Sequence, residues 1–404
     1  MDDAVKKWKP EICPHEAVCG GCCYQKISYE KQLKIKQQTV EKLLSKMGKV
    51  EKIKGAVNPY FYRNKVHGVF GCDKKGNVYT GIYQEGTHRI VPVDKCLIED
   101  ERAGKIMNTL CRLVRSFKFQ VYDEDRGTGL FRHVLIRTGH MTGEIMVVLV
   151  LASPILPSRN NFIRELKRLH PEITTIVLNV NNKKTSMVLG EKNITAFGRG
   201  YIEDVLCGLR FRISPSSFYQ INSEQTEVLY QIAVDFAGLT GKERVLDAYC
   251  GIGTIGMTAA GNAKEVIGIE LNRDAVRDAV ANASLNGIRN IRFVNEDAGK
   301  FMIQMAARRE KADVVLMDPP RSGSTKEFID SVKVLNPKRV VYVSCNPETL
   351  ARDLKQFIKN GYFVKKIQPV DMFPFTGHVE TVVLMSKGAV RPVDERFART
   401  GAEA

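Results

Sequence analysis

The feature that most constrains the fold of this chain is a regular alternation of short apolar runs and helix-like segments after about residue 211. The apolar runs are nearly continuous, which is typical of strands that are buried on both faces. Alternating strands and helices predict an α/β fold with a doubly wound, mostly parallel sheet. We expect seven strands, at residues 244–248, 265–270, 291–295, 313–318, 339–344, 362–370 and 379–385.

The last two expected strands are joined by a loop that contains Pro374 and Gly377 and is too short for a crossover helix. Parallel neighbours need such a crossover, so these two strands should be antiparallel to each other. If the final strand also runs against the parallel set, its first residues lie at the edge where the other strands end. This orientation decides which of its side chains can reach a ligand at that edge.

A glycine-rich turn follows the first expected strand, in the segment Asp-Ala-Tyr-Cys-Gly-Ile-Gly-Thr-Ile-Gly that begins at Asp247. Such a turn lets the backbone approach a nucleotide closely, although a purely structural turn or an NAD site has the same pattern. Acidic residues follow the next strands: Glu270 ends the second, Asp297 follows the third, and Asp318-Pro-Pro follows the fourth. The acid before the glycines and the Asp-Pro-Pro turn favour S-adenosylmethionine over a dinucleotide. We therefore expect a Rossmann-like class I methyltransferase domain.

The fifth expected strand ends in Ser-Cys-Asn-Pro, which places Cys345 at the cofactor edge of the sheet. A buried structural cysteine is the simplest interpretation of a lone thiol. However, a helix that begins at Pro347 would leave free backbone N–H groups near the sulfur, and these favour the thiolate. Methylation at carbon 5 of uracil requires a thiolate, because its addition at carbon 6 turns carbon 5 into a nucleophile.

The covalent adduct formed in this way needs a base that removes the carbon 5 proton, so that the cysteine can be expelled. Glu380 stands at the start of the final expected strand, in the segment Gly-His-Val-Glu-Thr. A glutamate on a strand surface is the simpler interpretation, but Glu380 precedes an apolar run and lies at the cofactor edge if the strand is antiparallel. His378 is the alternative base.

Three of the ten cysteines are clustered near the N-terminus, as Cys13-x5-Cys19-x2-Cys22. A reducing cytoplasm disfavours disulfides, so metal binding is the first interpretation of so dense a group, and free structural cysteines are the second. Zinc ribbons usually have two separated pairs of cysteines, whereas three clustered cysteines and a distant fourth suit an iron–sulfur cluster. Spacing alone leaves the fourth ligand open among Cys96, Cys72 and Cys111.

The net charge of the chain is +16, which fits either a well-solvated surface or a polyanionic partner such as a nucleic acid. The N-terminus lacks the apolar core of a signal peptide, and the longest apolar run, residues 145–152, is too short to cross a bilayer. We therefore expect a cytoplasmic protein that does not bind a membrane. Nothing in the sequence implies an obligate protein partner.

Together these motifs resemble the 23S ribosomal RNA uracil-5 methyltransferases, in the iron–sulfur branch of the RNA 5-methyluridine methyltransferases. Cys-Gly-Gly-Cys-x-x-Gln, Phe-Tyr-Gln-x-Asn, Asp-Pro-Pro-Arg, Ser-Cys-Asn-Pro and His-Val-Glu-Thr occur here in the order of that family. The resemblance covers nearly the whole chain and implies that Cys345 is the nucleophile and Glu380 the base. It further implies a [4Fe-4S] cluster on Cys13, Cys19, Cys22 and Cys96, and contacts to S-adenosylmethionine by Gln220, Tyr249, Glu270 and Asp318.

The patterns and the resemblance divide the chain into three expected parts. These are an iron–sulfur segment with a helix (1–50), a β-rich RNA-binding domain that includes the fourth cluster cysteine (51–208), and an S-adenosylmethionine-dependent methyltransferase domain (209–404). Many members of the family carry a small β-barrel RNA-binding domain ahead of the cysteines, but only twelve residues precede Cys13. RNA contacts are therefore expected in the basic, aromatic-rich middle of the chain, for example at residues 60–65.

Three other functions account for fewer of these features. Related enzymes modify the T-loop uridine of tRNA, and the cluster cysteines disfavour that substrate without removing it. Adenine amino-group methyltransferases usually have an aromatic residue after the two prolines, where Arg321 stands here. A non-catalytic iron–sulfur RNA-binding protein leaves the coincidence of Cys345 and Glu380 at one edge unexplained.

Overall fold

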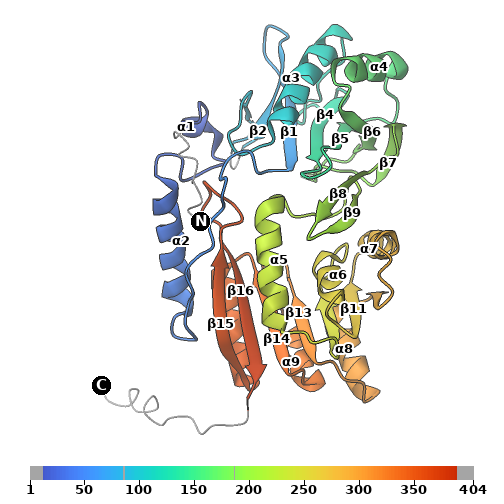
Figure 1. The fold of residues 1–404 in the computed structure, drawn as a ribbon. Coiled ribbons are helices and arrows are strands. Elements are labelled where there is room, and N and C mark those ends of the chain that lie inside the picture. Colours follow the sequence, from blue (N-terminus) through green and yellow to red (C-terminus); the bar gives the residue numbers. More distant parts are fainter. Residues whose placement is uncertain (1–11, 85–86, 186, 389–404) are drawn as a thin grey trace, which may run out of the picture.

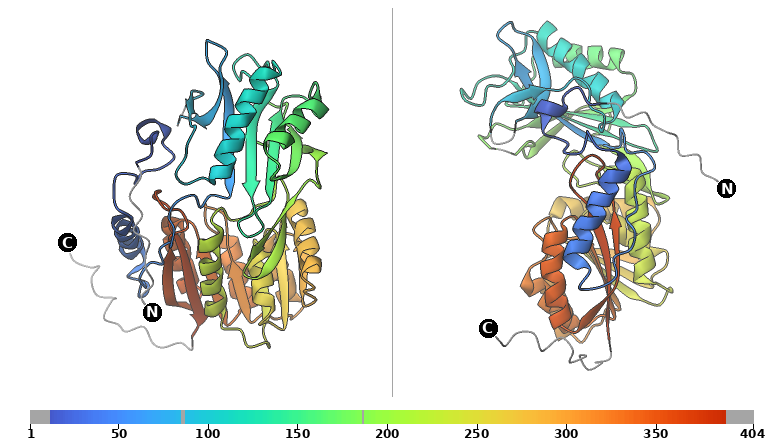
Figure 2. Two further views of the ribbon diagram at one scale, coloured as in Figure 1. Left: turned by 45° about the horizontal axis from the view of Figure 1, so that its top comes forward. Right: turned by 90° about the vertical axis from the view of Figure 1, so that its left-hand side faces the viewer.

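In the computed structural model, which describes residues 12–84, 87–185 and 187–388, two seven-stranded sheets lie one above the other (Figure 1). The middle of the chain forms the upper sheet, and the C-terminal half forms the lower one. A two-stranded hairpin connects them, and an N-terminal helix stands beside the lower sheet (Figure 2).

The lower sheet has the strand order β12-β11-β10-β13-β14-β16-β15, and only β16 runs against its neighbours. The doubly wound α/β fold predicted from the sequence is confirmed, and so is the antiparallel pairing of the last two strands. The strands are β10 (Arg244–Ala248), β11 (Glu265–Glu270), β12 (Ile291–Asn295), β13 (Val314–Met317), β14 (Arg339–Ser344), β15 (Tyr362–Val370) and β16 (Glu380–Lys387).

Both faces of this sheet are covered by helices, which explains why its strands are continuously apolar. In β14, Val341 and Val343 pack on one face with α5, α6 and α7, while Val340 and Tyr342 pack on the other with α8, α9 and α10. The helices are α5 (Ser223–Ala237), α6 (Thr254–Ala260), α7 (Arg273–Leu285), α8 (Ala298–Ala307), α9 (Lys326–Leu335) and α10 (Pro347–Lys359).

The start of α10 is fixed by local sequence. Pro347 occupies the first turn, where its missing N–H has no partner to lose, and the side chain of Asn346 accepts a backbone hydrogen bond as the N-cap. Leu350 and Leu354 are buried one turn apart and hold the helix on the sheet. Because β14 ends just before this cap, Cys345 is held between a strand end and a helix start.

The upper sheet has the strand order β3-β2-β1-β4-β5-β6-β7, and α3 and α4 cover one of its faces. The edge strands β3 and β7 are only partly buried. The elements are β1 (Lys65–Cys72), β2 (Val78–Tyr83), β3 (Ile90–Pro92), α3 (Glu101–Ser116), β4 (Phe131–Thr138), β5 (Ile145–Leu151), α4 (Arg159–Leu169), β6 (Ile173–Val180) and β7 (Lys192–Phe197).

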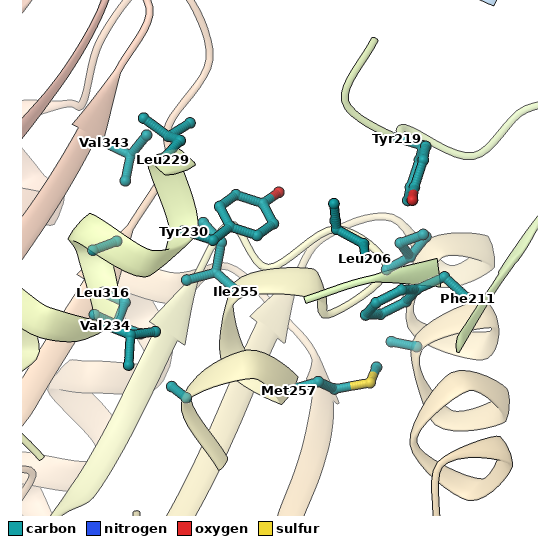
Figure 3. Packing of buried hydrophobic residues seen from close by; sticks show 14 of the residues in the cluster. Leu206, Phe211, Tyr219, Leu229, Tyr230, Val234, Ile255, Met257, Leu316 and Val343 are labelled. Carbon is teal, nitrogen blue, oxygen red and sulfur yellow. The ribbon is translucent and has the colours of Figure 1, made fainter. Parts of the chain in front are cut away.

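The hairpin of β8 (Ile202–Leu206) and β9 (Leu209–Ile213) spans residue 208, where the sequence analysis places a domain boundary. Its side chains Leu206 and Phe211 join a buried apolar cluster that also contains Leu135 of the upper sheet and Tyr230 of α5. Figure 3 shows Leu206 and Phe211 of the hairpin together with Tyr230 and other members of this cluster. The two sheets therefore share one core, which fixes their relative orientation.

The N-terminal segment consists of α1 (Glu16–Cys19) and α2 (Tyr29–Leu44). Along α2 the four buried side chains follow each other at intervals of four residues: Gln32, Lys36, Val40 and Leu44. Val40 and Leu44 join the core of the lower sheet, and burying each contributes about 1.5–3 kcal/mol. Burial of the polar Gln32 and Lys36 was not indicated by the apolar pattern. Neither α2 nor any other helix in the described ranges is both long and apolar enough to cross a membrane.

Candidate active site and cysteine cavity

A cavity of about 690 Å³ opens at the carboxyl ends of the parallel strands, where doubly wound sheets bind their ligands. Its size is that of a small-molecule site, for which roughly 300–1,000 Å³ is typical. All six residues that the sequence analysis assigns to cofactor binding and catalysis line it: Gln220, Tyr249, Glu270, Asp318, Cys345 and Glu380. Residues from the ends of four strands, from the start of β16 and from the segment before α5 therefore meet in one space.

Cys345 and Glu380 enter this cavity from adjacent, antiparallel strands. Ser344, the last residue of β14, pairs with Thr381 of β16. One position further along this register, Cys345 stands opposite Glu380. The reversed direction of β16 thus brings its first residue to the edge where the parallel strands end.

His378, the alternative base, lies outside the wall of the cavity. Its side chain is exposed, and its Nδ1 atom lies 3.4 Å from a guanidinium nitrogen of Arg321. Loss of part of its solvation, and then the charge of Arg321, lower the pKa of His378. Geometry therefore favours Glu380 over His378 as the group that faces Cys345.

The interior of the cavity is acidic. Burial, and then the nearby Asp318, raise the pKa of Glu380 well above its usual value. Burial likewise raises the pKa of Asp318 to about 7. The pKa of the Cys345 thiol is raised to about 11 by burial and by Glu380 and Asp318, against the opposing charge of Arg321. Carboxylates this close cannot all ionise without a cation, so the cavity suits a positively charged ligand.

The glycine-rich turn is held in place by two carboxylates. Glu270 accepts a hydrogen bond from the backbone N–H of Gly251 at 3.0 Å, and Asp247 accepts one from Gly256 at 2.9 Å. Within the turn Tyr249 has a φ of +62°, a strained conformation for a bulky residue that costs about 1–3 kcal/mol. These contacts keep the turn, and the Tyr249 side chain, at the cavity wall.

Two aromatic rings of the wall were not found by sequence reasoning. Phe218 has 65% of its surface exposed and lines the cavity beside Gln220, and Phe373 is brought there by the loop between β15 and β16. The backbone carbonyl of Gln220 accepts a hydrogen bond from Asn64 Nδ2 at 2.9 Å, which ties this wall to the upper sheet. The only signal for Gln220 in the sequence is the Phe-Tyr-Gln-x-Asn motif.

A second, smaller cavity of about 80 Å³ lies between the N-terminal segment and the upper sheet. Cys13, Cys19, Cys22 and Cys96 all line it, whereas Cys72 and Cys111 do not. Burial raises the pKa of Cys19, Cys22 and Cys96, in the last case to about 12, and Cys13 raises the first two further. The four thiols are therefore close enough to disfavour one another's ionisation.

Three residues in the wall of this cysteine cavity have buried side-chain atoms without a hydrogen-bond partner: Gln25 Oε1, Arg63 Nε and His67 Nε2. Buried polar atoms are normally paired, so each exception calls for an explanation. Across the described part of the chain, no group of three or more His, Cys, Asp or Glu side chains is arranged to hold a metal ion. As placed, the thiols do not form a site for a single ion.

Comparison with known proteins identifies the family. The model of the family described as tRNA (Uracil-5-)-methyltransferase matches residues 28–388. The chain belongs to this uracil-5 methyltransferase family. An uncharacterised RNA methyltransferase of Caldanaerobacter subterraneus subsp. tengcongensis is 43% identical over 380 residues, which cover 93% of this chain and 84% of that relative. Another, of Halalkalibacterium halodurans, is 43% identical over 378 residues, which cover 92% and 82%.

A solved structure resembles this uracil-5 methyltransferase family member over most of its length. It is the crystal structure of Pyrococcus abyssi tRNA (uracil-54, C5)-methyltransferase in complex with S-adenosyl-L-homocysteine. The TM-score is 0.77 at 28% identity, and the match covers 91% of this chain and 86% of that one. The similarity confirms the Rossmann-like methyltransferase core that the sequence predicts.

Proposed function

We propose that this protein transfers a methyl group from S-adenosylmethionine to carbon 5 of a uridine in 23S ribosomal RNA, in the cytoplasm. The observation that carries the proposal is the opposition of Cys345 and Glu380 in a cavity that the glycine-rich turn also lines. A nucleophile and a base side by side in the wall of one space are what covalent catalysis at a pyrimidine ring needs.

In the first step the Cys345 thiolate adds to carbon 6 of the uracil, and the displaced electron pair forms an enolate. Carbon 5 of the enolate attacks the methyl group of the sulfonium, whose carbon–sulfur bond breaks to release neutral S-adenosylhomocysteine. Glu380 then removes the carbon 5 proton. The resulting electron pair re-forms the ring double bond and expels the Cys345 thiolate. The raised pKa of Glu380 makes its ionised form a stronger base for this proton.

The acidic interior supports S-adenosylmethionine as the methyl donor, since its sulfonium is a cation. We assign its binding to Gln220, Tyr249, Glu270 and Asp318. Glu270 ends the second strand of the sheet, where an acid hydrogen-bonds the ribose hydroxyls of a bound nucleoside. Bound sulfonium also favours the ionised forms of the neighbouring acid groups and of Cys345, because opposite charges lower the pKa of an acid.

The proposal includes a [4Fe-4S] cluster on Cys13, Cys19, Cys22 and Cys96. What supports it is the resemblance of the cysteine pattern and the presence of all four thiols in the wall of one cavity. The unpartnered atoms of Arg63 and His67 in the same wall provide N–H donors for its sulfur atoms.

The domain at residues 51–208 is proposed to contact the RNA, and Lys65 is its best-supported phosphate ligand. Among the described residues Lys65 has no hydrogen-bond or ion-pair partner, and burial, Arg137 and Arg63 lower its pKa to about 8. Arg137 of β4, which pairs with Lys65 of β1, donates a hydrogen bond to the carbonyl of Ser217. Ser217 precedes Phe218 of the active-site wall. A cation without a partner, outside the cavity but linked to its wall through Arg137, suits the phosphate of a nucleotide whose base enters the cavity.

A tRNA uridine is the second candidate substrate, and the structural similarity to a tRNA (uracil-54, C5)-methyltransferase favours it. The cysteine set, which resembles that of the ribosomal RNA enzymes, favours 23S ribosomal RNA. The chemistry at Cys345 and Glu380 is the same for both substrates.

The proposal is tested with total RNA from cells that lack the gene, incubated with the purified protein and S-adenosylmethionine labelled in its methyl group. We expect label as 5-methyluridine in 23S ribosomal RNA, located by nuclease digestion and mass spectrometry. Label in tRNA alone would establish the second candidate. RNA binding without any 5-methyluridine would overturn the enzymatic function and favour a non-catalytic RNA-binding protein.

A further inference from the structure

The loop between β15 and β16, residues 371–379, carries Phe373 into the active-site cavity and leads directly to Glu380. We call it the catalytic loop. Phe375 within it has a φ of +67°, which a non-glycine residue adopts only when its surroundings enforce it. Glu380 begins β16, where it pairs with Val370 of β15, and the contacts that hold this loop add to that pairing in fixing its position.

Five consecutive carbonyl groups of the catalytic loop, from residue 371 to residue 375, each accept a hydrogen bond from outside the loop. The donors belong to the N-cap and first turn of α5, to α2, to the segment before β1, and to residues 13–27, which we call the cysteine segment. They are Gln225 to residue 371 (2.9 Å), Asn222 to 372 (3.1 Å), Lys36 to 373 (3.0 Å), Tyr62 to 374 (3.0 Å), and the backbone N–H groups of Cys23 and Tyr24 to 375 (3.0 and 3.1 Å).

Gln32 of α2 connects the cysteine segment to the catalytic loop through a single side chain. Its Nε2 donates to the carbonyls of Tyr24 at 3.3 Å and Ile27 at 3.1 Å. Its Oε1 accepts from the backbone N–H of Phe375 at 2.9 Å. Gln32 is fully buried, and three hydrogen bonds use most of its capacity. The two segments therefore hold a fixed position relative to each other.

Lys36, one turn further along α2, forms the second attachment. Its ammonium lies 2.6 Å from Asp371 Oδ1, and Tyr29 donates to the other oxygen of that carboxylate at 2.9 Å. Lys36 and Asp371 are 1% and 0% exposed, so this ion pair is shielded from salt and water. It fixes the first residue of the catalytic loop, and the Lys36 bond to residue 373 fixes the residue that enters the cavity.

We propose that Gln32 and Lys36 are positioning residues for the proton-removal step, and that through them and Cys23 the order of the cysteine segment sets the geometry of Glu380. The inference rests on the proposed function. Glu380 must meet the carbon 5 proton at hydrogen-bond distance, so a shift of about 1 Å costs roughly 100-fold in that step. Cys345 lies between β14 and α10, which do not carry the catalytic loop, so thiolate addition and methyl transfer should change much less.

The experiment measures the two steps separately in the full-length protein. Total RNA from gene-deleted cells is labelled with [5-³H]uridine, so that tritium released to water reports proton removal, and S-adenosylmethionine labelled with ¹⁴C reports methyl transfer. For Gln32→Met we expect tritium release to fall about 10- to 100-fold while single-turnover ¹⁴C transfer changes less than about twofold. The methylated protein–RNA adduct should accumulate.

Two further variants distinguish a positioning role from a general defect of folding. Gln32→Glu keeps an oxygen that can accept from Phe375, so its tritium release should lie closer to that of the parent. Lys36→Met with Asp371→Asn removes both buried charges together and should reproduce the defect of Gln32→Met. Lys34→Met, an exposed position on the same helix, is the matched control and should behave as the parent.

Parent-like tritium release in both Gln32→Met and the double variant would overturn this inference and leave the proposed function standing. A parallel loss of cofactor affinity, methyl transfer and tritium release would also overturn it, because a general defect of folding has that pattern. A parent protein that releases no tritium would overturn the proposed function itself, and the inference with it.

Discussion

Cys345 and Glu380 face each other across two antiparallel strands, one position beyond the pair Ser344–Thr381. In a sheet that is otherwise parallel, side chains at strand starts and strand ends lie at opposite edges. Because β16 runs in the opposite direction, its first residue, Glu380, lies beside Cys345, which follows the end of β14. The proximity of the two proposed catalytic residues is thus a consequence of sheet topology.

Substitutions at these two residues should fail at different steps. Cys345→Ala removes the attacking sulfur, so neither ¹⁴C transfer nor a denaturant-resistant RNA complex should form. Glu380→Gln keeps the size of the side chain and leaves Cys345 able to attack. Methyl transfer should then continue for one turnover, while tritium release from [5-³H]uridine falls about 10²–10⁴-fold. A complex that persists in Cys345→Ala would contradict the mechanism, and trapping by His378→Ala but not by Glu380→Gln would make His378 the base.

The pH dependence should follow the raised pKa of Glu380. A protonated carboxyl cannot accept the carbon 5 proton, so proton removal should slow as pH falls and recover as pH rises through the pKa of the bound enzyme. Addition of Cys345 should follow the same direction, because its pKa of about 11 leaves the thiol protonated in the free protein. We therefore expect tritium release to decline steadily as pH falls from the alkaline range. A rate that increases toward acid pH would contradict this assignment.

The cofactor assignment of Glu270 is tested by calorimetry. Glu270→Ala should weaken S-adenosylmethionine binding by about 1.5–3 kcal/mol, the value of a hydrogen bond to a charged group. Loss of the bond to Gly251 contributes to this effect, because the glycine-rich turn loses a support. Glu327→Ala, an exposed position on α9, is the control. Unchanged affinity in Glu270→Ala would exclude this residue from the cofactor site.

The four cysteines that line the second cavity should be required for binding of the iron–sulfur cluster, whereas the other cysteines should not. Anaerobically purified protein should be brown, and Cys19→Ala or Cys96→Ala should lose the colour together with iron and acid-labile sulfide. Cys72→Ala should keep them, because Cys72 is exposed and lies outside the cavity wall. If the parent protein were colourless and contained stoichiometric zinc, the four cysteines would form a zinc site and not a cluster site.

Lys65 should contribute to RNA affinity in a salt-dependent way. Lys65→Met removes one phosphate contact, so the slope of log K against log salt should decrease by about 1 for RNA from gene-deleted cells. Methyl transfer at saturating RNA should change little, because Lys65 does not line the active-site cavity. Lys75→Met, in the exposed turn after β1, provides the comparison. An unchanged slope would remove Lys65 from the RNA surface.

The sequence alone was sufficient to predict the strands of the lower sheet and the edge of that sheet at which the candidate site lies. Strands buried on both faces leave a continuous apolar run, and in a doubly wound sheet the residue after such a run lies at the ligand edge whatever the rest of the fold does. Glu270, Asp318 and Cys345 follow this rule, and all three line one cavity. Glu380 needed one further inference, that a short loop makes the last strand antiparallel, and the structure confirms that pairing.

Other features were decided only by tertiary structure. Gln32 and Lys36 are polar residues on the same face of α2 as the buried Val40 and Leu44. Partners more than 300 residues away in the chain make their burial favourable. Phe373 reaches the cavity because donors from several distant elements hold the catalytic loop. Periodicity in a sequence reports which side chains avoid water, but it carries no information on which distant hydrogen-bond partner will satisfy a buried polar group. The sequence therefore determined which residues can perform the chemistry, and the packing of the N-terminal segment on the catalytic loop decided how they are held.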